Sequence, residues 1–291
     1  MTMTLQGLDY PAPAKLNLFL HVVGQRPDGY HLLQSVFTLL DYGDNIRIRV
    51  RDDGQVHRVN DLPNIPEAED LAVRAANMLR EASGTTRGAD IEVEKRIPLG
   101  GGLGGGSSDA ATVLLALDRL WGTSFGPDAL AELGAALGAD IPFFLHGSTA
   151  WAEGIGEKLK PITIPRSWYV VLAPPVSVPT KEIFAAPELT RNTEALKMED
   201  FSAHPQEGRL NGTLARFHND LEPVVVARYP IVREHLEWLR QHGDARMTGS
   251  GSCVFAAYDS RDEAQKVLDL ASPMKGFIAQ GMATHPLRAT A

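Results

Sequence analysis

The sequence predicts an α+β protein with two domains, and three observations lead to that prediction. The chain has 291 residues, which is enough for two modest hydrophobic cores. The first half interleaves runs of strand-like alternation with helical patterns. The second half has helical patterns at 220–241 and 262–270 and a short strand at 253–258 between them. We place the domain change near residues 161–165, which gives domains at 1–162 and 163–291.

The first strand expected in the chain covers residues 14–22. Its leucines alternate with Lys15, Asn17, Phe19 and His21, so a strand here has one apolar face and one face that can carry polar groups. We therefore expect this strand to contribute to a functional site. The other segments with strand-like patterns are 45–51, 89–95, 149–153 and 167–173, and the helical patterns cover 70–82, 108–121 and 127–137, the last with proline near its first position.

Charge and cysteine content exclude several classes of protein. The 28 Lys and Arg residues against 36 Asp and Glu residues give a formal net charge of −8, which repels nucleic acid and other polyanions. Cys253 is the only cysteine, so an intrachain disulfide and a cysteine metal cluster are excluded. Residues 1–10 do not have the pattern of a secretory signal, and no run of about 18 apolar residues predicts a membrane span. We expect a cytoplasmic protein with no nucleic-acid or membrane partner.

The strongest functional signal is the glycine-rich segment 98–109, PLGGGLGGGSSD. Glycine permits positive φ and removes the Cβ atoms that would keep an anion away from main-chain amides. We expect Ser107 or Ser108 to cap the helix that follows, whose first N–H groups then favour a phosphate. The predicted nucleotide-binding residues are Pro98, Leu99, Gly100, Gly101, Gly102, Leu103, Gly104, Gly105, Gly106, Ser107 and Ser108.

Other glycine-rich designs fit this segment less well. It is not a Walker A loop, because no Gly-Lys-Ser/Thr follows the glycines. A Rossmann loop expects an acidic residue at the end of the next strand, whereas Asp118 falls within the predicted helix. The catalytic segments of protein kinases are absent from the sequence. A flexible linker is disfavoured, since the helix that follows is densely apolar and requires a core.

Three segments resemble the motifs of the GHMP kinase superfamily, and they occur in the order of that superfamily. They are PAKLN at 13–17, the glycine-rich segment at 98–108 with one extra glycine, and TGSGSCVF at 248–255. The resemblance implies a two-domain GHMP kinase fold, with a ribosomal protein S5 domain 2-like N-terminal domain and a ferredoxin-like C-terminal domain. It also implies ATP as a cofactor at the glycine-rich segment. Mg²⁺ is expected with ATP on chemical grounds, with a Ser107 or Ser108 hydroxyl as one candidate ligand.

Further segments resemble one branch of that superfamily, which acts in the non-mevalonate isoprenoid pathway. They lie at 12–22, 24–33, 40–44, 138–144 and 187–193, so the resemblance covers nearly the whole chain. It implies ATP-dependent phosphorylation of a hydroxyl on a small-molecule cytidyl substrate. Two other functions remain open at this point: a kinase of the superfamily that acts on mevalonate, homoserine or a sugar, and a nucleotide-binding sensor without turnover.

The resemblance assigns the catalytic roles to Lys15 and Asp140. Chemistry agrees, because a lysine in an apolar strand needs a partner and a carboxylate near a lysine stays ionised and able to accept a proton. Taken singly, Lys15 could be an ordinary edge-strand lysine and Asp140 a turn or cap residue. Their place within two of the matching segments favours the catalytic interpretation and argues against the sensor.

The resemblance also assigns residues to the cytidine part of the substrate. It implies that Tyr30 and Phe184 stack on the base and that His31 contacts its edge. Asn17 and Thr180 are expected to add polar contacts. Without the resemblance, Phe184 would be interpreted as a core residue and Tyr30 with His31 as a turn. Such stacking would allow an acidic protein to hold an anionic nucleotide conjugate.

Overall fold

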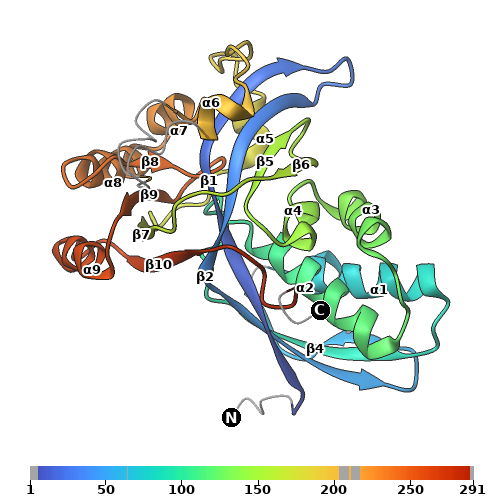
Figure 1. Cartoon of the computed structure of the whole chain (residues 1–291). Helices are drawn as coiled ribbons and strands as arrows, with labels where there is room; N and C mark the ends of the chain where they lie inside the picture. Colours follow the sequence, from blue (N-terminus) through green and yellow to red (C-terminus); the bar gives the residue numbers. More distant parts are fainter. Residues whose placement is uncertain (1–5, 64, 203–209, 211–216, 289–291) are drawn as a thin grey trace.

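The computed structural model describes residues 6–63, 65–202, 210 and 217–288, and a long antiparallel ribbon is its most extended feature (Figure 1). The ribbon pairs β1 (Leu8–Gln25) with β2 (His31–Arg51). Both strands are much longer than the segments 14–22 and 45–51 that alternation predicts. Residues 34–40 of β2 are all buried, and a strand buried on both faces shows no alternation from which to recognise it.

The alternation expected along β1 breaks after Asn17. From Asn17 to Leu20 the strand advances three residues while its partner advances two, from residue 37 to residue 35, so β1 contains a bulge. As a result, Phe19 packs in the same core as Leu16 and Leu18, whereas Leu20 joins the core of the second half. The prediction that Phe19 shares the polar face is therefore wrong.

The first half of the chain covers one side of the sheet with helices (Figure 1). Asp70 caps the first of them by accepting a hydrogen bond from the N–H of Ala72 at 2.9 Å, and Pro127 begins the third, as its position predicts. Their apolar sides pack with the sheet into one core. The elements are β3 (Val56–Arg58), a 3₁₀ turn at Glu67–Glu69, α1 (Leu71–Ser83), β4 (Gly88–Glu94), α2 (Gly105–Trp121), α3 (Pro127–Leu137), α4 (Ile141–His146), β5 (Ala150–Glu153) and β6 (Lys158–Pro161).

The second half is also α+β. The helix expected at 220–241 is divided in two at Pro230, because a residue before proline is disfavoured in the helical conformation and Tyr229 adopts φ −122° and ψ 86°. Part of the polar stretch 188–208 lies outside the described residues. The elements are β7 (Trp168–Leu172), α5 (Thr180–Phe184), α6 (Met198–Ser202), α7 (Glu222–Arg228), α8 (Pro230–Arg240), β8 (Arg246–Met247), β9 (Val254–Tyr258), α9 (Arg261–Leu270) and β10 (Gly276–Met282).

Strand β10 connects the two halves. It pairs with β7 along most of its length and with β2 at its end, so that the strand order β3-β4-β2-β10-β7-β9-β8 forms one continuous sheet. After β10 the chain returns to the first half, where Thr284 bridges Ser148 and Leu287 is part of the core. The expected division at residue 162 falls between β6 and β7 and stays a prediction. None of the helices in the described part of the chain combines the length and apolarity needed to cross a bilayer.

Candidate active site

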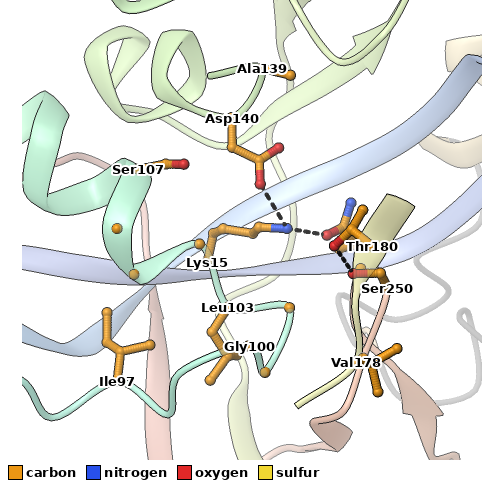
Figure 2. Close-up of a pocket in the computed structure, with 18 of the residues that line it drawn as sticks. Lys15, Ile97, Gly100, Leu103, Ser107, Ala139, Asp140, Val178, Thr180 and Ser250 are labelled. Atoms are coloured by element: carbon orange, nitrogen blue, oxygen red, sulfur yellow. Dashed lines mark hydrogen bonds and ion pairs between the residues drawn. The ribbon is translucent and has the colours of Figure 1, made fainter. Parts of the chain in front are cut away.

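A cavity of about 440 Å³ opens beside the glycine-rich segment, and residues of both halves line it (Figure 2). The first half contributes β1, the loop before α2 and the start of α4. The second half contributes the start of α5 and the turn after β8. The predicted site residues that line it are Lys15, Asn17, Pro98, Leu99, Gly100, Gly101, Gly102, Leu103, Gly104, Gly105, Gly106, Ser107, Asp140, Thr180 and Phe184.

The glycine-rich segment begins helix α2 differently from the prediction. The N-cap is Gly104, in the left-handed conformation with φ 73°, and no side chain caps the helix. Ser107 and Ser108 lie inside the first turns, and the buried Ser108 donates a hydrogen bond to the carbonyl of Pro13 at 2.7 Å. Ser108 therefore anchors α2 to β1 and does not line the cavity. Because a glycine precedes the helix, its first N–H groups have no capping side chain and can receive an anion.

The third GHMP-like segment, residues 248–255, packs against the glycine-rich segment and is hydrogen bonded to it. The N–H groups of Ser252 and Cys253 donate to the carbonyls of Gly100 and Gly101 at 3.2 and 3.1 Å. A Cβ atom at Gly102 would lie 2.3 Å from a main-chain oxygen of that segment, at Thr248. Such close approach of two backbones requires glycine here, and it fixes the loop against the second half of the molecule.

Lys15 and Asp140 meet at the cavity although 125 residues separate them in the sequence. The Lys15 Nζ atom lies 3.5 Å from the Asp140 Oδ2 atom, and Figure 2 shows the two side chains pointing toward one another. The ammonium also donates to Asn17 Oδ1 and lies 5.2 Å from the centre of the Phe37 ring. Asp140 occupies the N-cap position of α4 but makes no capping hydrogen bond, so its carboxylate is available to the cavity.

A second lysine lies under the start of α2. The Lys95 Nζ atom pairs with Asp109 Oδ2 at 2.8 Å and with Asp44 Oδ2, and a Cβ atom at Gly105 would lie 3.1 Å from it. Burial raises the pKa of the Asp109 carboxyl above its ordinary value, and the Lys95 ammonium acts in the opposite direction. Lys95 was not predicted from the sequence as a site residue. The one sequence signal for it is its position shortly before the glycine-rich segment 98–109.

The charged side chains at the cavity are few. Among the described residues those that line it are Lys15, Lys95 and Asp140, and the Lys95 ammonium is itself paired with Asp44 and Asp109. The chain as a whole has a formal charge of −8. A phosphorylated ligand would therefore depend on the lysines and on the main-chain N–H groups of the glycine-rich segment, and not on the field of the whole molecule.

The residues expected to hold the cytidine are only partly brought together. Phe184 lines the cavity, and the His31 ring packs against the Phe184 ring with ring centres 5.1 Å apart. The Thr180 hydroxyl is hydrogen bonded to that of Ser250 at 2.7 Å. Tyr30 is 60% exposed, lies outside the cavity lining and has the guanidinium of Arg26 6.0 Å from its ring centre. The stacking of Tyr30 opposite Phe184 stays a prediction.

Arg191 is a residue of this region that the sequence analysis missed. Its guanidinium donates to the carbonyls of Phe184, Ala186 and Leu189 and, through Nε, to the Nε2 atom of His31 at 3.1 Å. An accepting Nε2 places the proton of the neutral ring on Nδ1. Burial lowers the pKa of His31, and the nearby Arg191 charge lowers it further. The segment at 187–193 was part of the resemblance, but nothing in its sequence indicated a contact with residue 31.

Comparison with known proteins agrees with this geometry. The family described as GHMP kinases N terminal domain matches residues 70–148, and the family described as GHMP kinases C terminal matches residues 198–272. A 4-diphosphocytidyl-2-C-methyl-D-erythritol kinase from Thiobacillus denitrificans is 57% identical over 96% of both chains, and one from Aromatoleum aromaticum is 52% identical over 96% of this chain and 95% of its own. A crystal structure of 4-(cytidine 5'-diphospho)-2C-methyl-D-erythritol kinase has a TM-score of 0.80 at 35% identity, covering 94% of this chain and 99% of that one.

The fold and the two matching family models define a kinase of the GHMP class, and the expected α+β fold is confirmed. Kinases of this class use ATP as the phosphate donor. Within the class, the chain belongs to the family of 4-diphosphocytidyl-2-C-methyl-D-erythritol kinases.

Proposed function

We propose that this enzyme transfers the γ-phosphoryl group of ATP to the 2-hydroxyl of 4-diphosphocytidyl-2-C-methyl-D-erythritol, in the non-mevalonate isoprenoid pathway. The observation that carries the proposal is the pair Lys15 and Asp140, held 3.5 Å apart in a cavity that also contains the glycine-rich start of α2. Relatives that share more than half of their residues with this chain carry the name of this kinase.

The chain's own residues supply what phosphoryl transfer to an alcohol requires. The first N–H groups of α2 bind the phosphates, and Lys15 offsets the charge on the phosphoryl group as it moves. Asp140 orients the acceptor hydroxyl and takes its proton, either early or as the bond forms. Because little covalent chemistry is needed, in-line placement by these fixed groups accounts for most of the catalysis.

The cavity fits ATP and Mg²⁺ by the chemistry of the groups that line it. Gly100, Gly102 and Gly104 have φ values of 65°, 75° and 73°, so they form a backbone cradle without side chains. The Ser107 hydroxyl is an oxygen donor on the cavity wall and would hold Mg²⁺ together with the phosphates of ATP. Bound there, the ion would neutralise negative charge on the phosphate oxygens.

For the cytidyl part of the substrate, we infer binding on the α5 side of the cavity. Phe184 offers a ring face there, and aromatic stacking on a base contributes about 1 to 3 kcal/mol. His31 would contact the base edge through Nδ1, since Arg191 occupies its Nε2. Asn17 and Thr180 add polar contacts, and Tyr30 would close over the base from its exposed turn.

We infer the remaining properties from composition. A net charge of −8 and a phosphate site enclosed in a cavity favour a small-molecule partner over nucleic acid or a membrane. The single, buried cysteine fits a reducing compartment such as the cytoplasm.

An assay of ADP release tests the proposed function. The purified protein is incubated with ATP and, in separate reactions, with the cytidyl substrate, mevalonate, homoserine or a sugar. We expect ADP release above the ATP-only rate with the cytidyl substrate alone. Release with another alcohol would assign a different kinase of the class, and ATP binding without release on any substrate would indicate a nucleotide sensor.

A further inference from the structure

A chain of buried hydrogen bonds lies directly behind Lys15. The Lys15 ammonium donates to Asn17 Oδ1, and Asn17 Nδ2 donates to the hydroxyl of Ser35 at 2.9 Å. The Ser35 hydroxyl in turn donates to the main-chain carbonyl of Phe19 at 2.6 Å. Ser35 and Asn17 are each 2% exposed, so these groups have little access to water as an alternative partner.

The last acceptor in this series of hydrogen bonds, the Phe19 carbonyl, determines the direction of all the others. The carbonyl of Phe19 can only accept, so the one proton of the Ser35 hydroxyl must point to it. The hydroxyl is then left as an acceptor for Asn17, which requires the NH₂ group of the amide on that side and the Oδ1 atom on the side of Lys15. A rotated amide would instead direct its NH₂ group at the ammonium, a donor facing a donor.

The bulge in β1 makes the Phe19 carbonyl available for this purpose. Phe19 has no partner in the pairing of β1 with β2, because the register shifts between Asn17 and Leu20. The main chain of Asn17 is held separately, since its N–H donates to the Thr248 hydroxyl at 2.9 Å. Backbone contacts thus fix the position of Asn17, while the orientation of its amide depends on Ser35.

We propose that Ser35 is a positioning residue for phosphoryl transfer, which holds the Asn17 amide so that the Lys15 ammonium is fixed between Asn17 Oδ1 and Asp140. An ammonium has three protons. Two are directed by these oxygens, and the third is left for the phosphoryl group. The inference rests on the proposed function, because it assigns Ser35 a role in that reaction.

The variants Ser35→Ala, Ser35→Thr and Thr38→Val test the proposal. Thr38 is a matched control, because it is a buried hydroxyl three residues further along β2 that bonds to Thr149 at 3.3 Å, away from Lys15. We expect Ser35→Ala to lower kcat by about 10-fold to 100-fold, the scale for a misplaced catalytic group, with the KM values little changed. Ser35→Thr keeps the hydroxyl and should keep most of the kcat. Thr38→Val should keep the wild-type kcat while losing about as much thermal stability as Ser35→Ala.

A double-mutant cycle separates positioning from a general loss of packing. With Asn17→Ala as the background, removal of the Ser35 hydroxyl should lower kcat little further, since the amide it orients is gone. Wild-type kcat in Ser35→Ala overturns the proposal. Equal losses of kcat in Ser35→Ala and Thr38→Val, or additive losses in the cycle, overturn it as well.

A readout without substrate distinguishes failure of this inference from failure of the proposed function. In protein labelled with ¹⁵N-asparagine, the Asn17 side-chain NH₂ signals should be protected from exchange with water in the wild type and in Ser35→Thr, and should lose that protection in Ser35→Ala. Unchanged protection in Ser35→Ala refutes the positioning role, whatever the enzyme phosphorylates. Loss of protection, combined with no ADP release by the wild type on the cytidyl substrate, refutes the proposed function alone.

Discussion

Lys15 is a buried cation in the part of β1, residues 12–22, that is buried throughout. Its ammonium is stabilised by the Asp140 carboxylate at 3.5 Å, by Asn17 Oδ1 and by the face of Phe37. Each partner interacts favourably with the charged ammonium, and these interactions offset the free-energy cost of removing the charge from water. A cation that is already desolvated and oriented interacts more strongly with a phosphoryl group than a solvated one.

We predict that Lys15→Ala and Asp140→Asn each lower kcat by about 100-fold or more, because each removes charge or proton acceptance at the reacting atoms. ATP affinity should change much less, since the main-chain amides of the glycine loop remain. ADP release and ATP titration measure the two effects. Lys160→Ala is the control, because Lys160 is an exposed lysine whose ammonium pairs with Glu153 at 3.5 Å, away from the cavity lining. Wild-type turnover in either variant would remove the catalytic assignment.

Arg191 is predicted to act through His31. In Arg191→Met, the pKa of His31 should rise toward its ordinary value of about 6.5, because the nearby positive charge is gone. NMR titration of His31 in the wild type and in the variant provides the test.

The matched control for Arg191 is Arg233→Met. Arg233 also donates from its guanidinium to a main-chain carbonyl, that of Val226, but at an exposed position on α8. This variant should leave the His31 titration as it is in the wild type. An unchanged His31 titration in Arg191→Met would contradict the predicted role of Arg191.

At the scale of single elements, the start of α2 depends on a glycine where a capping serine was expected. Gly104 has φ 73°, and a Cβ atom there would lie 2.9 Å from Phe144 Cζ and 3.2 Å from Lys15 Cε. The residue thus lets the backbone turn into the helix and leaves room for the Lys15 side chain. A serine cap at this position would be strained and would crowd Lys15.

Gly104→Ala and Gly122→Ala form a matched pair at the two ends of α2. Gly122 is the C-cap with φ 68°, but nothing lies within 4 Å of a Cβ atom there. Both variants should lose about 1 to 2 kcal/mol of stability from the left-handed conformation. Only Gly104→Ala should also lower kcat, because its methyl group displaces Lys15. Thermal melts and steady-state kinetics measure the two effects, and equal kcat in the two variants would refute the spatial argument.

The sequence predicted the helices better than the strands. The start of α3 was marked by a proline, which acts through neighbours in the sequence. Most of β2 and all of β10 were not predicted. A central part of β2 is buried on both faces, and β10 shows no regular alternation of apolar and polar residues, so both strands are recognised only by their pairing with other strands. The bulge in β1 was not predicted either, because a bulge is a shift in the register between two paired strands.

At the scale of the whole molecule, the sheet continues from one half to the other through β10. The cavity is lined from both sides of this junction, with Lys15 on β1 of the first half and Thr180 on α5 of the second. The buried histidines His21 and His285 lie on segments that pack across the same junction, the far part of β1 and the chain after β10. Their protonation is therefore linked to the stability of the assembled fold.

Stability is predicted to fall on acidification between about pH 6.5 and 4. Burial lowers the pKa of both His21 and His285 to about 4, whereas an unfolded histidine titrates near 6.5. In that window the unfolded chain binds protons that the native chain does not, so the free energy of unfolding decreases as the pH falls. Melting temperatures at several pH values measure it. His21→Phe should weaken this dependence, whereas His57→Gln, at an exposed position, should leave it unchanged.

By itself the sequence determined an α+β fold and, through its resemblance to the GHMP kinases, the class of kinase, with 98–108 as the predicted phosphate loop and Lys15 and Asp140 as the candidate catalytic pair. These conclusions depend on motifs whose residues are contiguous. Only the tertiary structure decided which groups surround that pair: the Ser35 hydroxyl behind Asn17, Lys95 under α2 and Arg191 against His31. Such contacts join residues far apart in the chain through strand register, a bulge and helix packing, and none of these leaves a pattern in a single segment.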